Sequence, residues 1–137
     1  MSRIRNRDTS PETIVRKGLH GRGYRYRLHD KKLPGRPDVV LPKYHAVLNT
    51  NGCFWHGHDC HLFRLPKTRR CFWEKKIRRT MLRDDSNQEL LTQMGWRVAV
   101  VWECALRGKT RQSIDEVIEN LDSWLRANIR FTEIRGK

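Results

Sequence analysis

Two cysteines and three histidines fall within one short stretch, and this cluster constrains the fold more than any other part of the chain. The stretch Asn49–His61 reads Asn-Thr-Asn-Gly-Cys-Phe-Trp-His-Gly-His-Asp-Cys-His. Thiolates and imidazoles together suit Zn²⁺, which takes four such ligands in a tetrahedron. The spacing is not that of a zinc finger, so these donors need a distant partner, and Cys71 and Cys104 are the only other thiols. We therefore predict a functional loop held by zinc.

The charge of the chain points to a polyanionic partner. There are 29 Lys and Arg against 15 Asp and Glu in 137 residues, which gives a formal net charge of +14. An excess of this size on a small domain is typical of proteins that bind nucleic acid. The 5 tryptophans add aromatic surface that can stack on bases or insert between them.

Neither a membrane span nor a signal peptide is predicted. No apolar run reaches the roughly 18 residues that a span requires, and residues 1–5 lack the apolar core of a secretory signal. We expect a cytoplasmic protein without membrane contact. In that reducing compartment, the 4 cysteines are expected to be metal ligands or free thiols before disulfides.

The hydrophobic pattern predicts a single α/β domain over residues 1–137. Residues 1–8 form a basic arm, and Thr9-Ser-Pro-Glu12 opens the first helix as a capping box. The other predicted elements, in chain order, are strands at 24–28, 38–41 and 45–50, a helix over 72–94, a strand at 96–102 and a helix after Ser113. This order predicts a mixed central sheet flanked by helices.

An oxygen-rich site is predicted where two strands end. Asp38 stands at the start of an apolar strand, where a buried carboxylate is costly unless it meets a cation or hydrogen-bond donors. The neighbouring strand brings Thr50 and Asn51 beside it, and carboxylate and carbonyl oxygens together suit Mg²⁺. Glu12 could supply another acid, although half of a capping box is an equally good role on spacing alone. An isolated Asp38 would simply cap its strand.

A hydrolytic site also needs a base, and histidine titrates near neutral pH. His56 and His58 lie two residues apart and tend to face different ways, so one can bind zinc while the other faces a scissile phosphate. His61 could be the zinc ligand instead. Asp84 and Asp85 are either solvated acids among arginines, or one of them orients the catalytic imidazole. The remaining histidines are expected at the surface or with local partners: His20, His29 and His45.

Two aromatic pairs, Phe54-Trp55 and Phe72-Trp73, stand in polar or basic surroundings. The first lies between a glycine and candidate metal ligands, where burial in a core would be awkward. Insertion of such rings into a base stack costs least at a mispaired step. The other tryptophans lie on apolar faces and are expected in the core: Trp96, Trp102 and Trp124.

Four ordered motifs resemble the Vsr family of very-short-patch-repair DNA mismatch endonucleases. They are Pro34-Gly-Arg-Pro-Asp38, Gly52-Cys-Phe-Trp-His56, the Phe72-Trp73 helix with Arg83-Asp84, and Gly95-Trp-Arg-Val continued by Val-Trp-Glu-Cys104. The resemblance covers nearly the whole chain. It implies a restriction-endonuclease-like fold related to the PD-(D/E)xK nucleases. It also implies a Mg²⁺-dependent enzyme that nicks duplex DNA 5′ to the thymine of a T:G mismatch, the lesion left when 5-methylcytosine deaminates.

The same resemblance implies roles for individual residues. Asp38 and the Thr50 carbonyl match the magnesium site, and His56 matches the histidine that activates water, with Asp84 and Glu12 as supporting acids. The implied structural zinc ligands are Cys53, His58, Cys60 and Cys104, which leaves Cys71 and His61 as non-ligands. The expected DNA contacts are Phe54, Trp55 and Trp73 as an aromatic wedge, with Arg36, Lys67, Arg69 and Arg70. The implied protein is a monomer at the bacterial nucleoid, with a possible mismatch-repair protein as partner.

Three departures from the family pattern bear on activity. Asn51 stands where well-known relatives carry a histidine that handles the scissile phosphate, and Asn can donate a hydrogen bond but carries no positive charge. Weaker or differently pH-dependent activity is implied. The N-terminal arm is shorter than in some relatives, and the lysine of the PD-(D/E)xK signature is absent, consistent with a histidine-based variant. Two other readings keep most of these features: a zinc-stabilised DNA-binding module without catalysis, and a restriction-like nuclease that cuts matched duplex in both strands.

Overall fold

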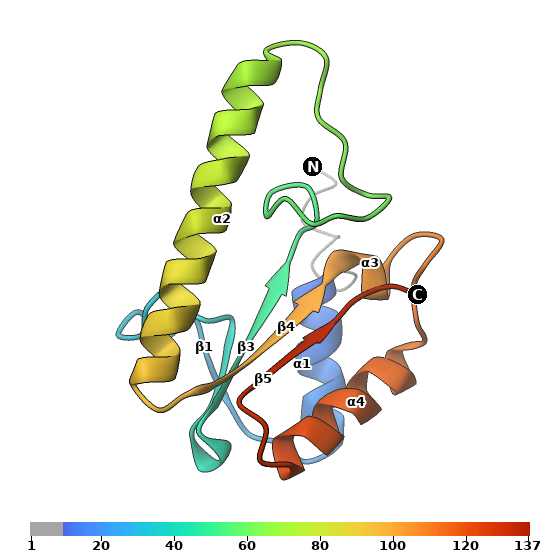
Figure 1. Cartoon of the computed structure of the whole chain (residues 1–137). Coiled ribbons are helices and arrows are strands. Elements are labelled where there is room, and N and C mark those ends of the chain that lie inside the picture. Colours follow the sequence, from blue (N-terminus) through green and yellow to red (C-terminus); the bar gives the residue numbers. More distant parts are fainter. Residues whose placement is uncertain (1–9) are drawn as a thin grey trace, which may run out of the picture.

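One five-stranded mixed sheet forms the centre of the molecule (Figure 1). The computed structural model describes residues 10–137. The strands lie in the order β1-β2-β3-β4-β5 and are Arg27–Leu28, Val39–Leu41, Ala46–Asn51, Arg97–Trp102 and Phe131–Ile134. The pairs β1–β2 and β2–β3 are antiparallel, whereas β3–β4 and β4–β5 are parallel. The predicted mixed sheet is therefore confirmed.

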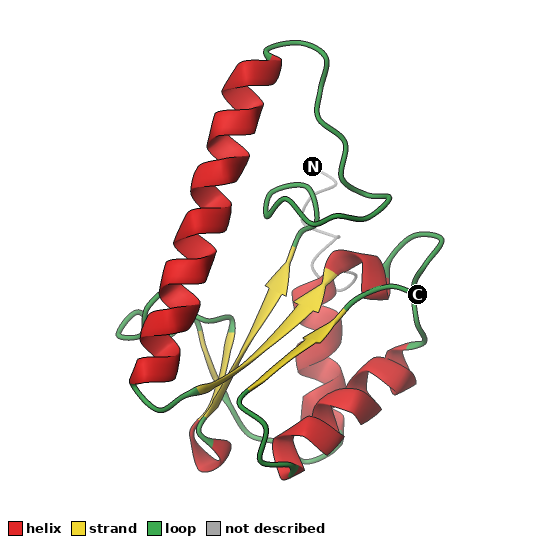
Figure 2. Ribbon diagram, viewed as in Figure 1, coloured by secondary structure: helices red, strands yellow, loops and turns green. Residues whose placement is uncertain are grey.

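Helices cover both faces of this sheet (Figure 2). They are α1 Pro11–Gly21, α2 Arg70–Gln93, α3 Glu103–Leu106 and α4 Ile114–Arg126, with a short 3-10 turn η2 at Pro42–Tyr44. The larger core joins α1 and α4 to one face through residues such as Leu19, Leu48 and Leu121. The smaller core joins the opposite face to α2 through Leu91. None of the described helices has both the length and the apolar character of a membrane span.

The first helix begins one residue later than the capping box predicts. Ser10 is the N-cap, and its hydroxyl accepts a hydrogen bond from the Thr13 amide at 3.3 Å. Thr9 and the basic arm at 1–8 lie outside the described residues. Glu12 therefore has no part in a capping box, and its carboxylate contacts other side chains.

Two strand predictions need correction. The strand expected at 24–28 pairs only at Arg27 and Leu28, because Tyr24 is buried and donates its hydroxyl hydrogen bond to the Asp122 carboxylate. The edge strand β5 was not predicted. Within it Ile134 alone is buried, so its sequence carries too little of an apolar pattern to indicate a strand.

Helix α2 extends well beyond the sheet, alongside the loop that follows β3 (Figure 1). The helix predicted over 72–94 is present, but of its side chains only Ile77 and Leu91 are buried, so it has no continuous apolar face. Met81, Leu90 and Met94 are exposed. The half of α2 nearest its N-terminus is thus a projecting basic and aromatic surface next to the carboxyl ends of β3 and β4.

Candidate active site and metal cluster

The structure brings four distant Cys and His donors together. One ligand atom from each of Cys53, His58, Cys60 and Cys104 lies within 4.8 Å of all the others. The His58 Nδ1 atom is 3.5 Å from Cys53 Sγ and 3.6 Å from Cys104 Sγ. Zinc bonds to sulfur and nitrogen at a tetrahedral angle place those two atoms about 3.6 Å apart, so the donors fit a tetrahedral cation. Cys71 and His61 are outside this cluster.

Burial shifts the pKa values of residues in this cluster. It raises the pKa of the Cys53 and Cys104 thiols and lowers the pKa of the His58 imidazole. A neutral imidazole has a lone pair for a metal, whereas buried thiolates require a cation to balance them. The Trp102 ring stacks on His58, with 4.0 Å between ring centroids. Trp102 is half-buried: it packs against the smaller core, as its apolar surroundings in the sequence predict, and it also forms a wall of the cluster.

The loop of the cluster is also held by contacts that the sequence does not signal. The Cys53 amide donates to Glu103 Oε1 at 3.1 Å, and the Gly136 amide donates to Cys104 Sγ at 3.2 Å. Arg135 bonds the Asp59 carbonyl at 3.0 Å and its carboxylate at 3.1 Å. These partners are far apart in sequence and form no spacing pattern. The C-terminal segment after β5 is therefore part of the site's support.

Gly57 seats this loop directly on α2. Its φ is +63°, and a Cβ added there would lie 2.5 Å from the Met81 sulfur and 2.9 Å from Ile77 Cγ2. A left-handed backbone with no room for a side chain requires glycine. Because the loop lies so close to the helix, His56 on the loop reaches Asp84 on α2.

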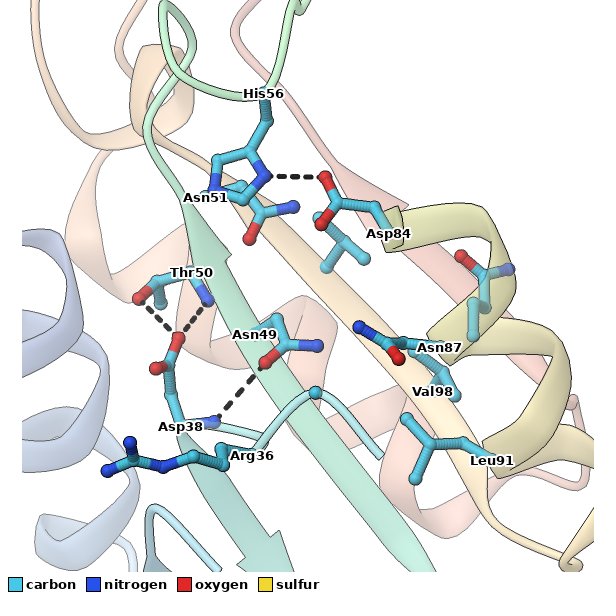
Figure 3. Close-up of a pocket in the computed structure, with 13 residues that line it drawn as sticks. Arg36, Asp38, Asn49, Thr50, Asn51, His56, Asp84, Asn87, Leu91 and Val98 are labelled. Atoms are coloured by element: carbon cyan, nitrogen blue, oxygen red, sulfur yellow. Dashed lines mark hydrogen bonds and ion pairs between the residues drawn. The ribbon is translucent and has the colours of Figure 1, made fainter. Parts of the chain in front are cut away.

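The imidazole of His56 is held by one carboxylate (Figure 3). Its Nδ1 atom is 2.5 Å from Asp84 Oδ2, and the two side chains are 25% and 35% exposed. A carboxylate at Nδ1 favours the tautomer that carries its proton there, which leaves Nε2 to accept a proton. Asp85 is exposed. Of the two acids considered from the sequence, Asp84 is the one that contacts the imidazole.

Asp38 lines the same cleft, and its carboxylate points toward Thr50 on β3 (Figure 3). Its Oδ2 atom accepts hydrogen bonds from the Thr50 amide at 2.7 Å and the Thr50 hydroxyl at 3.1 Å. The Asp38 amide donates to Asn49 Oδ1 at 3.2 Å. These donors stabilise a half-buried carboxylate immediately before β2. Asn51 also lines this cleft.

His29 joins Glu12 and Asp38 in one group, although no sequence pattern indicates a role for it. Its Nε2 atom is 2.9 Å from Glu12 Oε2, and its Nδ1 atom is 3.8 Å from Asp38 Oδ1. One ligand atom from each of the three residues lies within 4.8 Å of the others. His29 is exposed, as expected, but its partners come from α1 and from the residue before β2. Only the antiparallel pairing of β1 with β2 brings them together.

The aromatic residues expected to contact DNA form one cluster at the mouth of the site. The ring centroids of Phe54, Trp55 and Trp73 lie 5.1 to 5.6 Å apart, and Trp55 is 50% exposed. The basic residues expected to contact DNA are all exposed: Arg36, Lys67, Arg69 and Arg70. The Arg69 guanidinium lies 4.2 Å from the centre of the Phe72 ring. At least one of these cations, Arg69, thus lies next to the aromatic cluster, because Phe72 is in contact with Trp73.

A mixed sheet with helices on both faces, and acids and a histidine in one cleft beside the end of a strand, defines a restriction-endonuclease-like nuclease class. The family described as DNA mismatch endonuclease Vsr matches residues 1–62. The DNA mismatch endonuclease Vsr of Escherichia coli is 44% identical over 91% of this chain and 80% of its own length. The type II nicking enzyme V.XorIIP of Xanthomonas oryzae is 50% identical over 77% of this chain and 78% of its own. For V.NmeAIP, a type II nicking enzyme of Neisseria meningitidis, the identity is 41% over 88% of each chain.

The chain therefore belongs to the Vsr family of DNA mismatch endonucleases. It is an endonuclease that acts on DNA, which contradicts the alternative of a binding module without catalysis.

Proposed function

We propose that this enzyme nicks one strand of duplex DNA on the 5′ side of the thymine in a T:G mismatch. The observation that carries the proposal is the shared cleft, which Asp38 and the His56–Asp84 pair line together. The exposed Trp55 ring and its contact with Trp73 add a surface that can stack on bases. The E. coli relative is named for mismatches, and the Xanthomonas and Neisseria relatives are named nicking enzymes. Such a product needs only one cleft and one catalytic chain, so the enzyme acts as a monomer.

His56 is the general base of the proposed reaction. Its Nε2 atom takes a proton from the attacking water, while the new bond forms between water oxygen and phosphorus. The P–O3′ bond breaks, which leaves a 5′-phosphate and a 3′-hydroxyl. The Asp84 carboxylate, 2.5 Å from Nδ1, stabilises the imidazolium that results.

Asp38 and the Thr50 carbonyl would hold the catalytic Mg²⁺. When bound, that ion supplies Lewis-acid stabilisation of charge developing on the phosphate. Asp38 fits this role because its carboxylate is oriented by the amide and the hydroxyl of Thr50. Asn51 lines the same cleft and can donate a hydrogen bond to a phosphate oxygen.

Zinc is the proposed occupant of the cluster formed by Cys53, His58, Cys60 and Cys104. All four positions are filled by protein donors, so the ion would have a structural role. It would hold His56, Phe54 and Trp55 in position, since all three lie on the loop that the cluster closes.

Selectivity for the mismatch is proposed to come from the cost of separating bases. Phe54, Trp55 and Trp73 would insert beside the mispair, and unstacking costs least where pairing is already weak. The surrounding cations would position the phosphates. Chromosomal DNA as substrate places the enzyme in the bacterial cytoplasm at the nucleoid, and a mismatch-repair protein is a candidate partner for handling the nicked product.

The test of catalysis compares Asp38→Asn with Asp85→Asn on a duplex that contains one T:G pair, with Mg²⁺ present. The Asp38 variant should lose nicking by about 10³-fold or more, because the proposed metal ligand is removed. Both variants should bind the duplex with wild-type affinity. Full nicking by Asp38→Asn would overturn the proposed site, and so would failure of the unmodified enzyme to nick with any divalent metal.

A further inference from the structure

The two oxygens of Asp38 have different surroundings. Oδ2 accepts hydrogen bonds from the Thr50 amide and hydroxyl (Figure 3). Oδ1 faces His29, whose Nδ1 atom is 3.8 Å away. A separation of 3.8 Å is too long for a hydrogen bond, yet it leaves the two atoms facing each other.

The sheet and helix α1 together orient the His29 imidazole. The His29 amide donates to the Asp38 carbonyl at 3.3 Å, which continues the β1–β2 pairing and sets the two side chains opposite each other. On the other side of the ring, Nε2 lies 2.9 Å from Glu12 Oε2. Glu12 is also paired with Arg16 at 3.5 Å. The positive charge of Arg16 offsets part of the negative charge of Glu12. Glu12 is therefore better suited to accept a hydrogen bond from a neutral His29 than to stabilise a His29 imidazolium.

This arrangement selects one tautomer of His29. A hydrogen bond from Nε2–H to Glu12 puts the proton on Nε2 and leaves the Nδ1 lone pair directed toward Asp38. A carboxylate behind one nitrogen and a metal at the other is the usual environment of a metal-bound histidine. The competing state is an imidazolium that pairs with both carboxylates and binds no metal.

The distance is within reach of a shared cation. An octahedral ion with bonds of about 2.1 Å places adjacent ligand atoms about 3.0 Å apart. His29 Nδ1 and Asp38 Oδ1 are 3.8 Å apart, so a small movement of the imidazole would bring both atoms to one ion.

We propose that His29 is a nitrogen ligand of the catalytic metal ion at Asp38, and that Glu12 positions its imidazole. This inference rests on the proposed function, because it concerns the metal of that same site. An imidazole ligand favours first-row transition ions, whereas Mg²⁺ prefers oxygen donors. The site should consequently bind Mn²⁺ more tightly than Mg²⁺, and the preference should depend on His29.

The experiment titrates Mn²⁺ into the zinc-loaded full-length protein without DNA and follows it by electron paramagnetic resonance. Loading with zinc first keeps Mn²⁺ from the cysteine cluster. The wild-type protein should bind Mn²⁺ at least about tenfold more tightly than His29→Ala. It should also show nitrogen coupling to Mn²⁺ in a pulsed measurement, and this coupling should disappear in the variant. His20→Ala, which removes an exposed histidine from the end of α1, is the matched control and should behave as wild type.

Glu12→Gln tests the positioning role separately. The amide can accept the Nε2–H bond through its oxygen, so nitrogen coupling should persist with weaker Mn²⁺ binding, whereas Glu12→Ala should reduce the coupling itself. Absence of nitrogen coupling in the wild-type protein would overturn the proposal, because it would mean that His29 is a bridging imidazolium or a bystander. Equal Mn²⁺ affinity in wild type and His29→Ala would do the same.

Failure here is separable from failure of the proposed function. Nicking of T:G duplex with Mg²⁺ by His29→Ala, together with no His29-dependent Mn²⁺ binding, rejects the ligand assignment and keeps the nuclease. Nitrogen coupling in a protein that nicks no mismatched duplex keeps the metal site and rejects the proposed substrate.

Discussion

At the scale of single residues, the contact between His56 and Asp84 is the most informative one in the cleft. It joins a side chain on the loop after β3 to a side chain on α2, with 2.5 Å between Nδ1 and Oδ2. The pair has the geometry of a general base with its supporting acid, in which the acid fixes the tautomer and stabilises the protonated ring.

Replacing Asp84 by Asn should therefore slow the chemical step and spare binding. Asn keeps the size of the side chain but lacks the negative charge, so we expect kcat to fall by about 10²–10⁴-fold. KM for a T:G duplex should change by less than about 3-fold. The measurement is single-turnover nicking beside Asp85→Asn, which should match wild type. An Asp84→Asn enzyme with wild-type kcat would refute the role of this pair.

Arg97 is expected to contribute strongly to the stability of the fold. Its guanidinium donates hydrogen bonds to carbonyls at the end of α4 and in η2, those of Tyr44, Trp124, Leu125, Ala127 and Ile129. It also lies 4.6 Å from the centre of the Trp124 ring. Burial lowers the pKa of Arg97, but the group stays charged at neutral pH because guanidinium is so strong a base.

Arg97→Lys should destabilise the fold, because one ammonium group cannot reach carbonyls on several sides. We expect a loss of about 2–4 kcal/mol and a fall in Tm of roughly 8–15 °C. Arg130→Lys, at an exposed side chain, should leave Tm unchanged. Equal melting curves for the two variants, recorded by circular dichroism, would show that these hydrogen bonds contribute little.

At the scale of elements, the loop after β3 depends on how closely it packs on α2. Gly57→Ala would combine a left-handed backbone with a Cβ closer than 3 Å to Ile77 and Met81. We expect a cost of about 1–3 kcal/mol and a fall in nicking of at least about tenfold, because His56 would move away from Asp84.

Gly21→Ala is the control for that substitution. A Cβ at Gly21 meets no atom within 4 Å, and its φ is not positive. The measurements are the thermal unfolding temperature and the nicking rate of both variants. A Gly57→Ala enzyme that melts and nicks like Gly21→Ala would show that the loop does not rely on this contact.

Elements with a strong local pattern could be predicted from the sequence, and those without one could not. The strand at 96–102 and the helix after Ser113 were expected and are present as β4 and α4, because a continuous apolar run and a capped 3.6-residue period are local signals. Strand β5 has one buried side chain, and α3 is one turn long, so neither leaves such a signal.

The candidate site shows the same division. Residue type marked Asp38, the histidines and the cysteines as candidates, and the family resemblance implied a role for each. His29, Glu103 and Arg135 could not, because each acquires its role through a partner brought near by the sheet. The type of a residue indicates which chemistry its side chain can take part in. Contacts between segments that are distant in sequence determine which other groups that side chain meets.

At the scale of the whole molecule, DNA recognition is proposed to depend on two features, the net positive charge and the aromatic cluster. In the proposed function, the net charge of +14 attracts the enzyme to any duplex, and the aromatic cluster of Phe54, Trp55 and Trp73 responds to weak base pairing. Substitution of a basic residue and substitution of an aromatic residue should therefore have different effects on DNA binding.

Lys67→Ala should weaken binding equally to matched and mismatched duplex. It should reduce the slope of log K against log salt by about 1, as expected for one lost phosphate contact. Trp55→Ala should leave that slope unchanged and reduce the preference for T:G over T:A by at least about fivefold. The measurement is fluorescence anisotropy at several salt concentrations. A Trp55→Ala protein that keeps its full preference for T:G would exclude insertion of this ring as the basis of selectivity.

The central claim is that one cleft cuts one phosphodiester beside a mispaired thymine. The most direct measurement uses a duplex with a single T:G pair, each strand labelled at its end with a different dye, and resolves the products to the nucleotide. We predict one product, from the thymine strand, cut on the 5′ side of the mispaired thymine, and no product from the matched T:A duplex. Cutting of both strands, or equal cutting of the matched duplex, would contradict the account and favour a restriction-like nuclease.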